Sequence, residues 1–341
     1  MHAGDDKAED TDELYEHLKI SVEKGVVLKR IDKYLFDRLP NTSRNRIQVA
    51  AKAGNILVNQ KPVKSNYKVK PFDEISLVLP YPVREYELKG ENIPLDIVYE
   101  DEELVVLNKP AGMVSHPGHG NYTGTLVNAL VYHFDNLPPN KSNEVSRPGL
   151  VHRLDKFTTG IMVVAKTEHT LTHLSRQFYE RTSERTYYAL VWGNPKNAKG
   201  TITGNIGRSV KDRKVFMVYE DGSQGKHAVT HYEVIKNYAH VSLIKCKLET
   251  GRTHQIRVHM KYMGHTLFND KEYGGDVILR GNTSGAYKKF IENCFELIPG
   301  QALHAKTLGF MHPTKNEFMQ FDSELPPGFK ALLDKWEKFN T

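Results

Sequence analysis

Short apolar runs with the character of β-strands dominate this chain after residue 95, and helical patterns only interrupt them. The strand-like runs cover residues 97–99, 104–107, 161–165, 186–192, 229–235 and 241–248. Helical patterns are expected at 126–131, 167–181, 253–262 and 328–338. Because strands and helices seldom alternate strictly, the pattern predicts an α+β domain on a mixed or antiparallel sheet, in preference to a doubly wound parallel sheet.

The segment between residues 26 and 80 differs from the rest of the chain in its charge. It holds eleven Lys and Arg against four Asp and Glu, a net charge of +7, whereas the whole 341-residue chain carries +6. One helix is expected over residues 28–39, and a second between a cap at 41–43 and Gly54, followed by two short strands. Because the cations concentrate in one small unit, the pattern favours an α/β RNA-binding module over a merely solvated basic surface.

These patterns divide the chain into four parts. We expect an acidic flexible tail over residues 1–25, the basic module over 26–80, a linker over 81–94 and the larger domain over 95–341. No apolar run reaches the ~20 residues needed to cross a bilayer, and a secretory signal is not indicated. Two cysteines cannot form a disulfide framework. We therefore expect a cytoplasmic monomer without membrane association.

Nucleotide and metal sites are not indicated by the sequence. The glycine-rich stretch 118–124 has the wrong spacing for a dinucleotide fingerprint, and no Walker lysine follows it. The chain has 16 histidines, but His254 and His259 are five residues apart and therefore lie off a common helical face. The pattern predicts no metal site and no cofactor.

The most informative polar stretch is residues 152–160, His-Arg-Leu-Asp-Lys-Phe-Thr-Thr-Gly, which precedes the apolar run 161–165. It places Asp155 between Arg153 and Lys156 at the start of an expected strand. A neighbouring guanidinium favours the ionised carboxylate that catalysis by an aspartate requires. In isolation, however, the pattern fits a surface turn better than a site.

Two further stretches carry candidate functional side chains. Residues 184–192 alternate as a strand, so Tyr187 and Tyr188 point to opposite faces. A tyrosine there either packs in the core or provides a face on which a base stacks. Arg252 and Arg257 stand where a strand gives way to a helix, a place that suits catalytic groups and surface ion pairs equally.

Taken in order, these stretches resemble the RluA/RluD family of pseudouridine synthases, and most of all the RluD-type enzymes of large-subunit ribosomal RNA. The matching segments are 108–112, 116–118, 124–130, 149–160, 185–187, 251–259, 303–305 and 312–313. The resemblance implies a pseudouridine synthase catalytic domain on a mixed or antiparallel sheet. It also implies that the basic segment is a module like the RNA-binding domain of the small ribosomal subunit's fourth protein.

The resemblance further implies roles for single residues. Asp155 matches the catalytic aspartate, Arg257 the arginine paired with it, and Tyr187 the tyrosine that stacks on the flipped base. The residues assigned to RNA contact and base flipping are Arg153, His152 and Leu303. Those assigned to RNA contact in the basic module are Arg30, Arg44, Arg46, Lys52 and Lys61. Neither metal nor cofactor is implied, because the isomerisation oxidises nothing and transfers no group.

The sequence therefore predicts an isomerase that converts uridine into pseudouridine in large-subunit ribosomal RNA, with RNA as its partner, in a pre-ribosomal particle or free. One alternative is the same chemistry on another ribosomal or transfer RNA site. Others are a non-catalytic RNA-binding factor of ribosome assembly and a hydrolase of N-glycosidic bonds. The joint presence of Asp155, Tyr187 and Arg257 disfavours the assembly factor, and no second acid or base for a hydrolase is found in the sequence.

Overall fold

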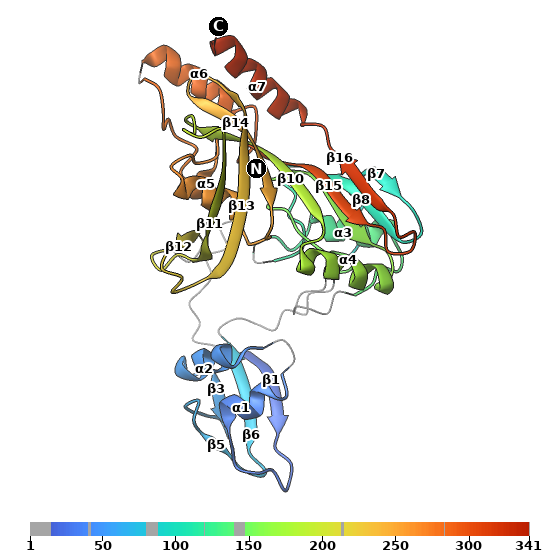
Figure 1. Ribbon diagram of the computed structural model, residues 1–341. Coiled ribbons are helices and arrows are strands. Elements are labelled where there is room, and N and C mark those ends of the chain that lie inside the picture. Colours follow the sequence, from blue (N-terminus) through green and yellow to red (C-terminus); the bar gives the residue numbers. More distant parts are fainter. Residues whose placement is uncertain are drawn as a thin grey trace, which may run out of the picture. The chain divides into compact units, whose positions relative to one another are not determined.

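The chain forms two compact units, of which the second begins at Leu88 (Figure 1). The computed structural model describes residues 15–39, 42–79, 88–118, 120–139, 147–212, 215–282 and 284–340. Residues 1–14 of the expected tail and residues 81–87 of the expected linker lie outside the described residues, as does part of the expected cap at 41–43.

The N-terminal unit is a small α/β fold around a core of its own. Its elements are, in chain order, β1 (Tyr15–Ser21), β2 (Lys29–Arg30), α1 (Ile31–Phe36), α2 (Arg44–Lys52), β3 (Ile56–Val58), β4 (Lys61–Pro62), β5 (Lys68–Val69) and β6 (Glu74–Leu79). Antiparallel pairing gives the strand order β1-β6-β3-β4, and β2 pairs with β5. Ser43 begins α2 by accepting a hydrogen bond from the N–H of Arg46. The apolar sides of both helices pack on the strands and close the core.

The start of this unit differs from the sequence expectation. The tail expected over residues 1–25 is too long, because residues 15–21 form β1 and pair with β6. The helix expected from Leu28 begins only at Ile31. Leu28 is 61% exposed, so the apolar side of the helix starts with Ile31, which is fully buried.

The expected linker also reaches too far into the second unit. The side chain of Asn128 donates a hydrogen bond of 2.8 Å to the Lys89 carbonyl, and the Glu91 N–H donates one of 2.9 Å to the Asn128 carbonyl. Leu88 packs against the core of the larger unit. Residues 88–94 are therefore held on the larger unit by hydrogen bonds and packing.

The larger unit is built on one mixed sheet. Its strands are β7 (Asp96–Glu100), β8 (Leu104–Lys109), β9 (Thr159–Ala165), β10 (Glu184–Trp192), β11 (Lys199–Arg208), β12 (Phe216–Tyr219), β13 (Lys226–Asn237), β14 (Val241–Leu248), β15 (Leu303–Met311) and β16 (Phe318–Asp322). In the described part of the chain they form a ten-stranded sheet of order β12-β11-β13-β14-β10-β15-β9-β8-β7, with β16 beside β15. Pairing along it is antiparallel except between β9 and β15, which run parallel. The predicted α+β class with a mixed, mostly antiparallel sheet is confirmed.

Helices cover both faces of this sheet. They are α3 (Leu126–His133), α4 (Glu168–Glu180), α5 (Gln255–Tyr262), α6 (Gly285–Phe295) and α7 (Pro327–Asn340), with a 3-10 turn η1 (Lys271–Tyr273). Val105 of β8 packs with residues of α3, whereas its neighbour Val106 packs with Leu174 of α4, so these helices lie on opposite faces. Helices α6 and α7 pack together around Trp336 at one end of the unit (Figure 1). No helix within the described ranges is long and apolar enough to span a membrane.

Gly160, the last residue of the polar stretch 152–160, is required by the close approach of β9 and β15. Its φ is +108°, and a Cβ at this position would lie 2.2 Å from the carbonyl oxygen of Ala305. The parallel pairing of the two strands sets Gly160 opposite Ala305, two residues after Leu303. This crossing brings the loop that carries Asp155 to the start of β15.

Candidate functional site

Asp155 lies in the short loop that leads into β9, and hydrogen bonds hold this loop on both sides of the carboxylate. The Ser115 hydroxyl donates to the Leu154 carbonyl (2.8 Å) and accepts from the Leu154 N–H (3.3 Å). On the other side, the Gly112 N–H donates to the Lys156 carbonyl (2.8 Å). The position of Asp155 is therefore fixed through the backbone of its two neighbours.

Lys109, at the end of β8, holds the same loop from within the protein. Its ammonium group donates to the carbonyls of Pro110 (2.7 Å), Met113 (2.8 Å) and Lys156 (3.1 Å), and the residue is 1% exposed. Burial lowers its pKa to about 7, an effect that the charge of Asp155 opposes. The sequence marked Lys109 only as part of the matching segment 108–112, and its supporting role is visible only in the fold.

Arg257, on α5, joins Asp155 to two further carboxylates. Its Nη1 donates to Asp155 Oδ2 (3.1 Å), its Nε and Nη2 donate to the two oxygens of Asp270 (2.7 Å each), and Nη2 also donates to Glu272 (2.5 Å). The Arg257 side chain is 4% exposed and that of Asp270 is fully buried. Burial disfavours the guanidinium charge, but the hydrogen bonds to Asp270 and the nearby carboxylates outweigh it and raise the pKa of Arg257. Arg257 therefore stays charged beside Asp155.

The structure brings Asp155 and Arg257 together, and it separates the adjacent Arg153 from that pair. Arg153 is exposed and forms no hydrogen bond or ion pair with the rest of the described chain. Asp270 was missed by the sequence reasoning. Asn269, the residue before it, has a φ of +60°, a left-handed conformation that turns the chain so that Asp270 faces Arg257.

His254 faces the second oxygen of Asp155. Its Nε2 lies 3.8 Å from Asp155 Oδ1, and its Nδ1 lies 2.9 Å from the Tyr273 hydroxyl. That hydroxyl also accepts a hydrogen bond from the Phe216 N–H (3.1 Å). Burial lowers the pKa of His254, although the charge of Asp155 opposes this effect. The direction of the hydrogen bond to Tyr273 sets which ring nitrogen of the neutral His254 carries the proton, and a hydroxyl that donates to Nδ1 leaves the proton on Nε2, facing Asp155.

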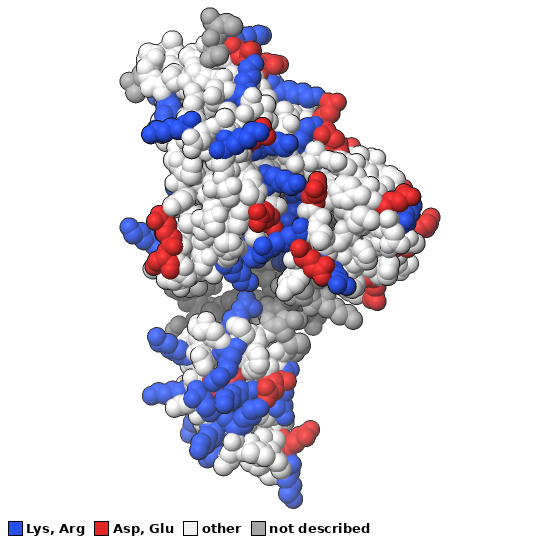
Figure 2. Space-filling model, in the orientation of Figure 1, with Lys and Arg blue, Asp and Glu red and all other residues white. Residues whose placement is uncertain are grey.

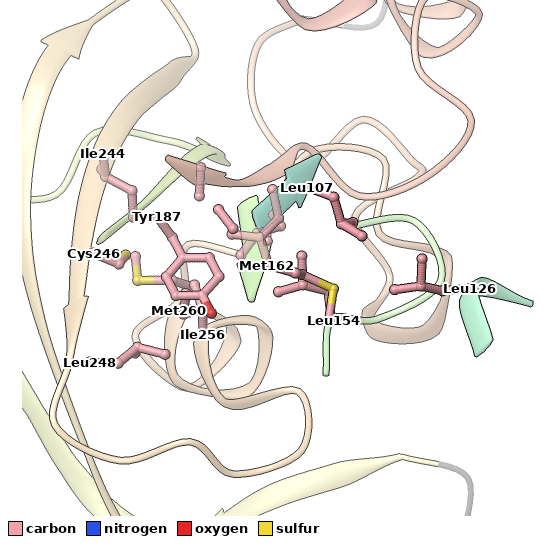
Figure 3. Close-up of a cluster of buried hydrophobic side chains, with 14 of the residues drawn as sticks. Leu107, Leu126, Leu154, Met162, Tyr187, Ile244, Cys246, Leu248, Ile256 and Met260 are labelled. Carbon is pink, nitrogen blue, oxygen red and sulfur yellow. The ribbon is translucent and has the colours of Figure 1, made fainter. Parts of the chain in front are cut away.

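Tyr187 and Leu303 supply the apolar part of the site from neighbouring strands. Tyr187 is 8% exposed, and its ring lies beside Cys246 and Met260 (Figure 3). Leu303 is 6% exposed and belongs to the same core cluster. Burial raises the pKa of Tyr187, so its hydroxyl stays protonated at neutral pH. Tyr188 points to the opposite face and packs with the core of α6 and α7, as the strand alternation predicts.

These side chains line one pocket of about 720 Å³. Asp155, Tyr187, His254, Arg257 and Leu303 all contribute to its walls. The remaining arginines that line it are Arg153, Arg181, Arg185 and Arg252. The volume is in the range of pockets that bind small ligands. In the described part of the chain, no three His, Cys, Asp or Glu side chains are grouped as metal ligands.

His152, which the sequence assigned to RNA contact, fixes the beginning of the loop that carries Asp155. Its Nε2 accepts a hydrogen bond from the Val163 N–H (3.1 Å), and its ring stacks on Phe178 with the ring centres 4.6 Å apart. Burial, together with the charge of Arg185, lowers the pKa of His152 to about 3. The ring is therefore neutral and forms a wall of the pocket.

In the N-terminal unit, one buried carboxylate holds two of the candidate RNA contacts. Arg30 and Arg44 each donate to the Asp32 carboxylate at 3.1 Å, and Gln48 donates a further hydrogen bond of 2.8 Å. The Asp32 side chain is fully buried, whereas both arginine side chains are 43% exposed. Burial would raise the pKa of Asp32, but the hydrogen bonds from Gln48 and the arginines lower it to about 2.

The other candidate contacts of this unit, Arg46, Lys52 and Lys61, are also exposed. Figure 2 shows Lys and Arg side chains outnumbering acidic ones on the visible face of the N-terminal unit. The cations that the sequence concentrates in this segment therefore lie on its surface, where a polyanion can reach them.

Two family models and several known proteins match this chain. Residues 103–262 match the family model described as RNA pseudouridylate synthase, and residues 29–75 match the S4 domain. An uncharacterized RNA pseudouridine synthase of Chlorobaculum parvum is 45% identical, covering 93% of this chain and 97% of the relative. The ribosomal large subunit pseudouridine synthase D of Zymomonas mobilis is 38% identical over 92% of this chain and 96% of its own length. The protein of that name from Haemophilus influenzae is 38% identical over 93% and 94%.

Two solved human structures share the fold. Human RNA Pseudouridylate Synthase Domain Containing 1 is 28% identical with a TM-score of 0.52, covering 71% of this chain and 89% of that structure. Human RNA Pseudouridylate Synthase Domain Containing 4 is 24% identical with a TM-score of 0.55, covering 71% and 93%. The mixed sheet with its helices is thus an architecture already seen in solved proteins.

Proposed function

Because this chain belongs to the RNA pseudouridine synthase family, whose members are isomerases, we propose that it converts uridine into pseudouridine in large-subunit ribosomal RNA. The relatives named for the ribosomal large subunit support this substrate, and the exposed cations of the S4 domain suit a structured RNA. One observation carries the assignment of Asp155 as the catalytic group. Its carboxylate is paired with the buried Arg257 in the pocket that Tyr187 lines.

The reaction defines what the pocket has to supply. The N1–C1′ bond of uridine breaks, the uracil rotates, and C5 joins C1′. The proton on C5 is released and N1 gains one, so the substrate is neither oxidised nor reduced. A carboxylate serves this reaction as a nucleophile at the sugar or the base, or as a base that removes a sugar proton, and Asp155 fits each of these roles.

Arg257 and His254 act on Asp155 in this proposal. A base that enters the pocket removes water from the carboxylate, which by itself would raise the pKa of the carboxyl group. Arg257 opposes that rise, and Asp270 holds Arg257 in place. In the tautomer protonated at Nε2, His254 would present an N–H to the other carboxylate oxygen, 3.8 Å away. Asp155 would thus remain ionised and oriented with the substrate bound.

The target uridine has to leave its stack before it reaches Asp155, which costs on the order of a few kcal/mol. Stacking on an aromatic ring recovers about 1–3 kcal/mol per base, and Tyr187 is the aromatic residue we assign to this contact. Leu303 would pack against the same base. Arg153 is exposed at the pocket and is assigned to the place in the RNA that the uridine vacates.

Release of tritium from C5-labelled uridine in large-subunit ribosomal RNA tests the proposal. The wild type is expected to release tritium, and Asp155→Asn, which has the same shape without the charge, to lower the rate about 10²- to 10⁴-fold. RNA affinity should change little in this variant. Wild-type turnover in Asp155→Asn would remove Asp155 from the chemistry.

The product distinguishes the alternative functions. Free uracil in place of an isomerised nucleoside would indicate hydrolysis of the N-glycosidic bond. Tight RNA binding without any release of tritium would indicate a ribosome-assembly factor. Pseudouridine maps of ribosomal and transfer RNA, from cells with and without this gene, would identify the modified uridines and separate the two substrate classes.

A further inference from the structure

Arg185 is a buried cation of the pocket that lacks a hydrogen-bonded or anionic partner. It is 7% exposed and its Nε is buried without a hydrogen-bond partner. Across the described residues, its guanidinium forms no hydrogen bond or ion pair. Burial lowers the pKa of Arg185, yet an arginine keeps its charge at neutral pH. A buried charge without a partner is costly to the fold, so its retention calls for a ligand.

Two contacts of this guanidinium supply no acceptor. Its central carbon lies 5.2 Å from the centre of the Phe178 ring. On another side, a Cβ at Gly251 would lie 2.9 Å from Nη1 of Arg185, so the glycine leaves the space that the guanidinium occupies. Both neighbours line the same pocket as Arg185 and leave its N–H groups without oxygen partners.

The other walls of the pocket do not neutralise this charge. The pocket is also lined by Arg153, Arg181 and Arg252, which form no ion pair with described residues. The lining carboxylates are engaged elsewhere. Asp155 is bound to Arg257 (3.1 Å), and Glu180 is bound to Arg176 (2.7 Å). The pocket therefore combines one paired catalytic carboxylate with a surplus of positive charge, which an anionic ligand would balance.

We propose that Arg185 is a phosphate site, at which its guanidinium binds a phosphodiester group of RNA next to the uridine in the pocket. The identification of the ligand as RNA rests on the proposed function. A guanidinium donates two parallel hydrogen bonds to phosphate oxygens, which would satisfy both the charge and the orphan Nε. Arg185 precedes Tyr187 by two residues on β10, about 7 Å along the strand. A base on Tyr187 and a phosphate on Arg185 thus belong to the same nucleotide or to its direct neighbour.

Affinity over a series of salt concentrations tests this site, with full-length protein and large-subunit ribosomal RNA as the probe. Arg185→Gln is expected to weaken binding about 10- to 100-fold. The slope of log affinity against log salt should become shallower by about 0.7–0.9, the value for one lost phosphate contact. Arg185→Lys keeps the charge but loses the planar guanidinium that binds two phosphate oxygens, so its RNA affinity should lie between those of the wild type and Arg185→Gln. Arg280→Gln is the control, since Arg280 is exposed and hydrogen-bonded to backbone carbonyls outside the pocket.

Thermal unfolding without RNA separates ligand binding from packing. Arg185→Gln should unfold at the wild-type temperature or above it, because the variant removes an unpaired buried charge. A clear fall in unfolding temperature, with RNA affinity and salt slope unchanged, would overturn the phosphate site and assign Arg185 to packing on Phe178.

Gly251→Ala tests the same site without removing a charge. Its added Cβ would displace the Arg185 guanidinium, so a weaker affinity at unchanged net charge is expected. Wild-type affinity in both Gly251→Ala and Arg185→Lys would contradict the proposal. Tritium release is measured in parallel with the wild type. Its absence would overturn the proposed function, while affinity and salt slope would still decide whether Arg185 binds phosphate.

Discussion

The N-terminal unit and the pocket that holds Asp155 arrange the same two kinds of charge in opposite ways. In the N-terminal unit one buried carboxylate, Asp32, holds two half-exposed arginines. In the pocket one buried arginine, Arg257, holds the three carboxylates Asp155, Asp270 and Glu272. The first arrangement leaves positive charge on the surface, and the second keeps a negative group fixed inside a pocket.

The difference reflects what each region presents to RNA. Exposed cations attract a polyanion over a distance that dissolved salt shortens to about 10 Å at 0.1 M. A buried network is screened much less, so its charges stay coupled at any ordinary ionic strength. Capture of RNA by the N-terminal unit should therefore depend on salt, whereas the chemical step in the bound complex should not.

Arg257→Gln should have the largest effect on stability and rate, because it removes the buried cation that joins the carboxylates of the pocket. The variant leaves Asp270 buried without its cation, an expected loss of about 3–5 kcal/mol of stability. It also frees Asp155, so the rate of isomerisation should fall about 10²- to 10⁴-fold. Urea unfolding and single-turnover tritium release at saturating RNA measure the two losses.

Arg257→Lys is the matched control for this prediction. It returns a charge but not the planar fork that binds both oxygens of Asp270 and reaches Asp155. Relative to Arg257→Gln, Arg257→Lys should regain more of the free energy of unfolding than of the isomerisation rate. A wild-type rate in Arg257→Gln would mean that Asp155 acts without a cationic partner.

The elements that carry the site follow from local patterns in the sequence. Apolar periodicity predicts β9, β10, β14 and α5 because it records which side of each element is buried. Strand β1 was not predicted, since its residues are largely polar and become a strand only by pairing with β6, far along the chain. The start of α1 was misplaced for a similar reason. Leu28 looked apolar enough for the helix but stays exposed in the fold.

The residues of the candidate site likewise divide into those that the sequence could propose and those whose roles depend on the fold. Asp155, Arg257 and Tyr187 lie in short ordered motifs, so the sequence could propose them. Asp270 and His254 could not be proposed, because their roles arise from contacts. Asp270 acts through its hydrogen bonds to Arg257. The proton position on His254 depends on the Tyr273 hydroxyl, which also accepts a hydrogen bond from the backbone of another strand. Whether a guanidinium is buried without a partner is likewise a property of the folded chain alone.

Asp32→Asn removes the buried carboxylate of the N-terminal unit and should have a moderate effect on RNA affinity. The variant raises the net charge by one unit, so charge alone would strengthen RNA binding. If Asp32 instead positions Arg30 and Arg44, affinity should fall about 3- to 10-fold, within the range for a charged hydrogen bond. Asp37→Asn makes the same charge change at an exposed residue paired with Lys29 and serves as the control. Equal affinity changes in the two variants would show that charge, and not position, governs capture.

Unfolding of the N-terminal unit at acid pH provides a second way to compare Asp32→Asn with Asp37→Asn. The pKa of Asp32 is about 2 in the folded chain, below its ordinary value of 3.8. A lowered pKa stabilises the fold fully above the ordinary value, and this stabilisation is lost as the pH falls toward 2. Unfolding of the wild-type unit should therefore depend on pH between about 4 and 2, and Asp32→Asn should remove the part of that dependence that Asp32 contributes. Asp37→Asn should keep it.

Tyr273→Phe should have the smallest effect, because it changes the buried network without removing a charge. If the Tyr273 hydroxyl donates to His254 Nδ1, its removal lets the ring proton occupy either nitrogen, so Nε2–H no longer always faces Asp155. The single-turnover rate should fall a few-fold at unchanged RNA affinity, and stability by about 1 kcal/mol for the unpaired Phe216 N–H. Tyr287→Phe, which loses a bond to the Arg280 carbonyl away from the pocket, is the control for stability. Nitrogen NMR of His254 reports the tautomer directly. A wild-type rate together with a proton moved to Nδ1 would show that the orientation of Asp155 depends on Arg257 alone.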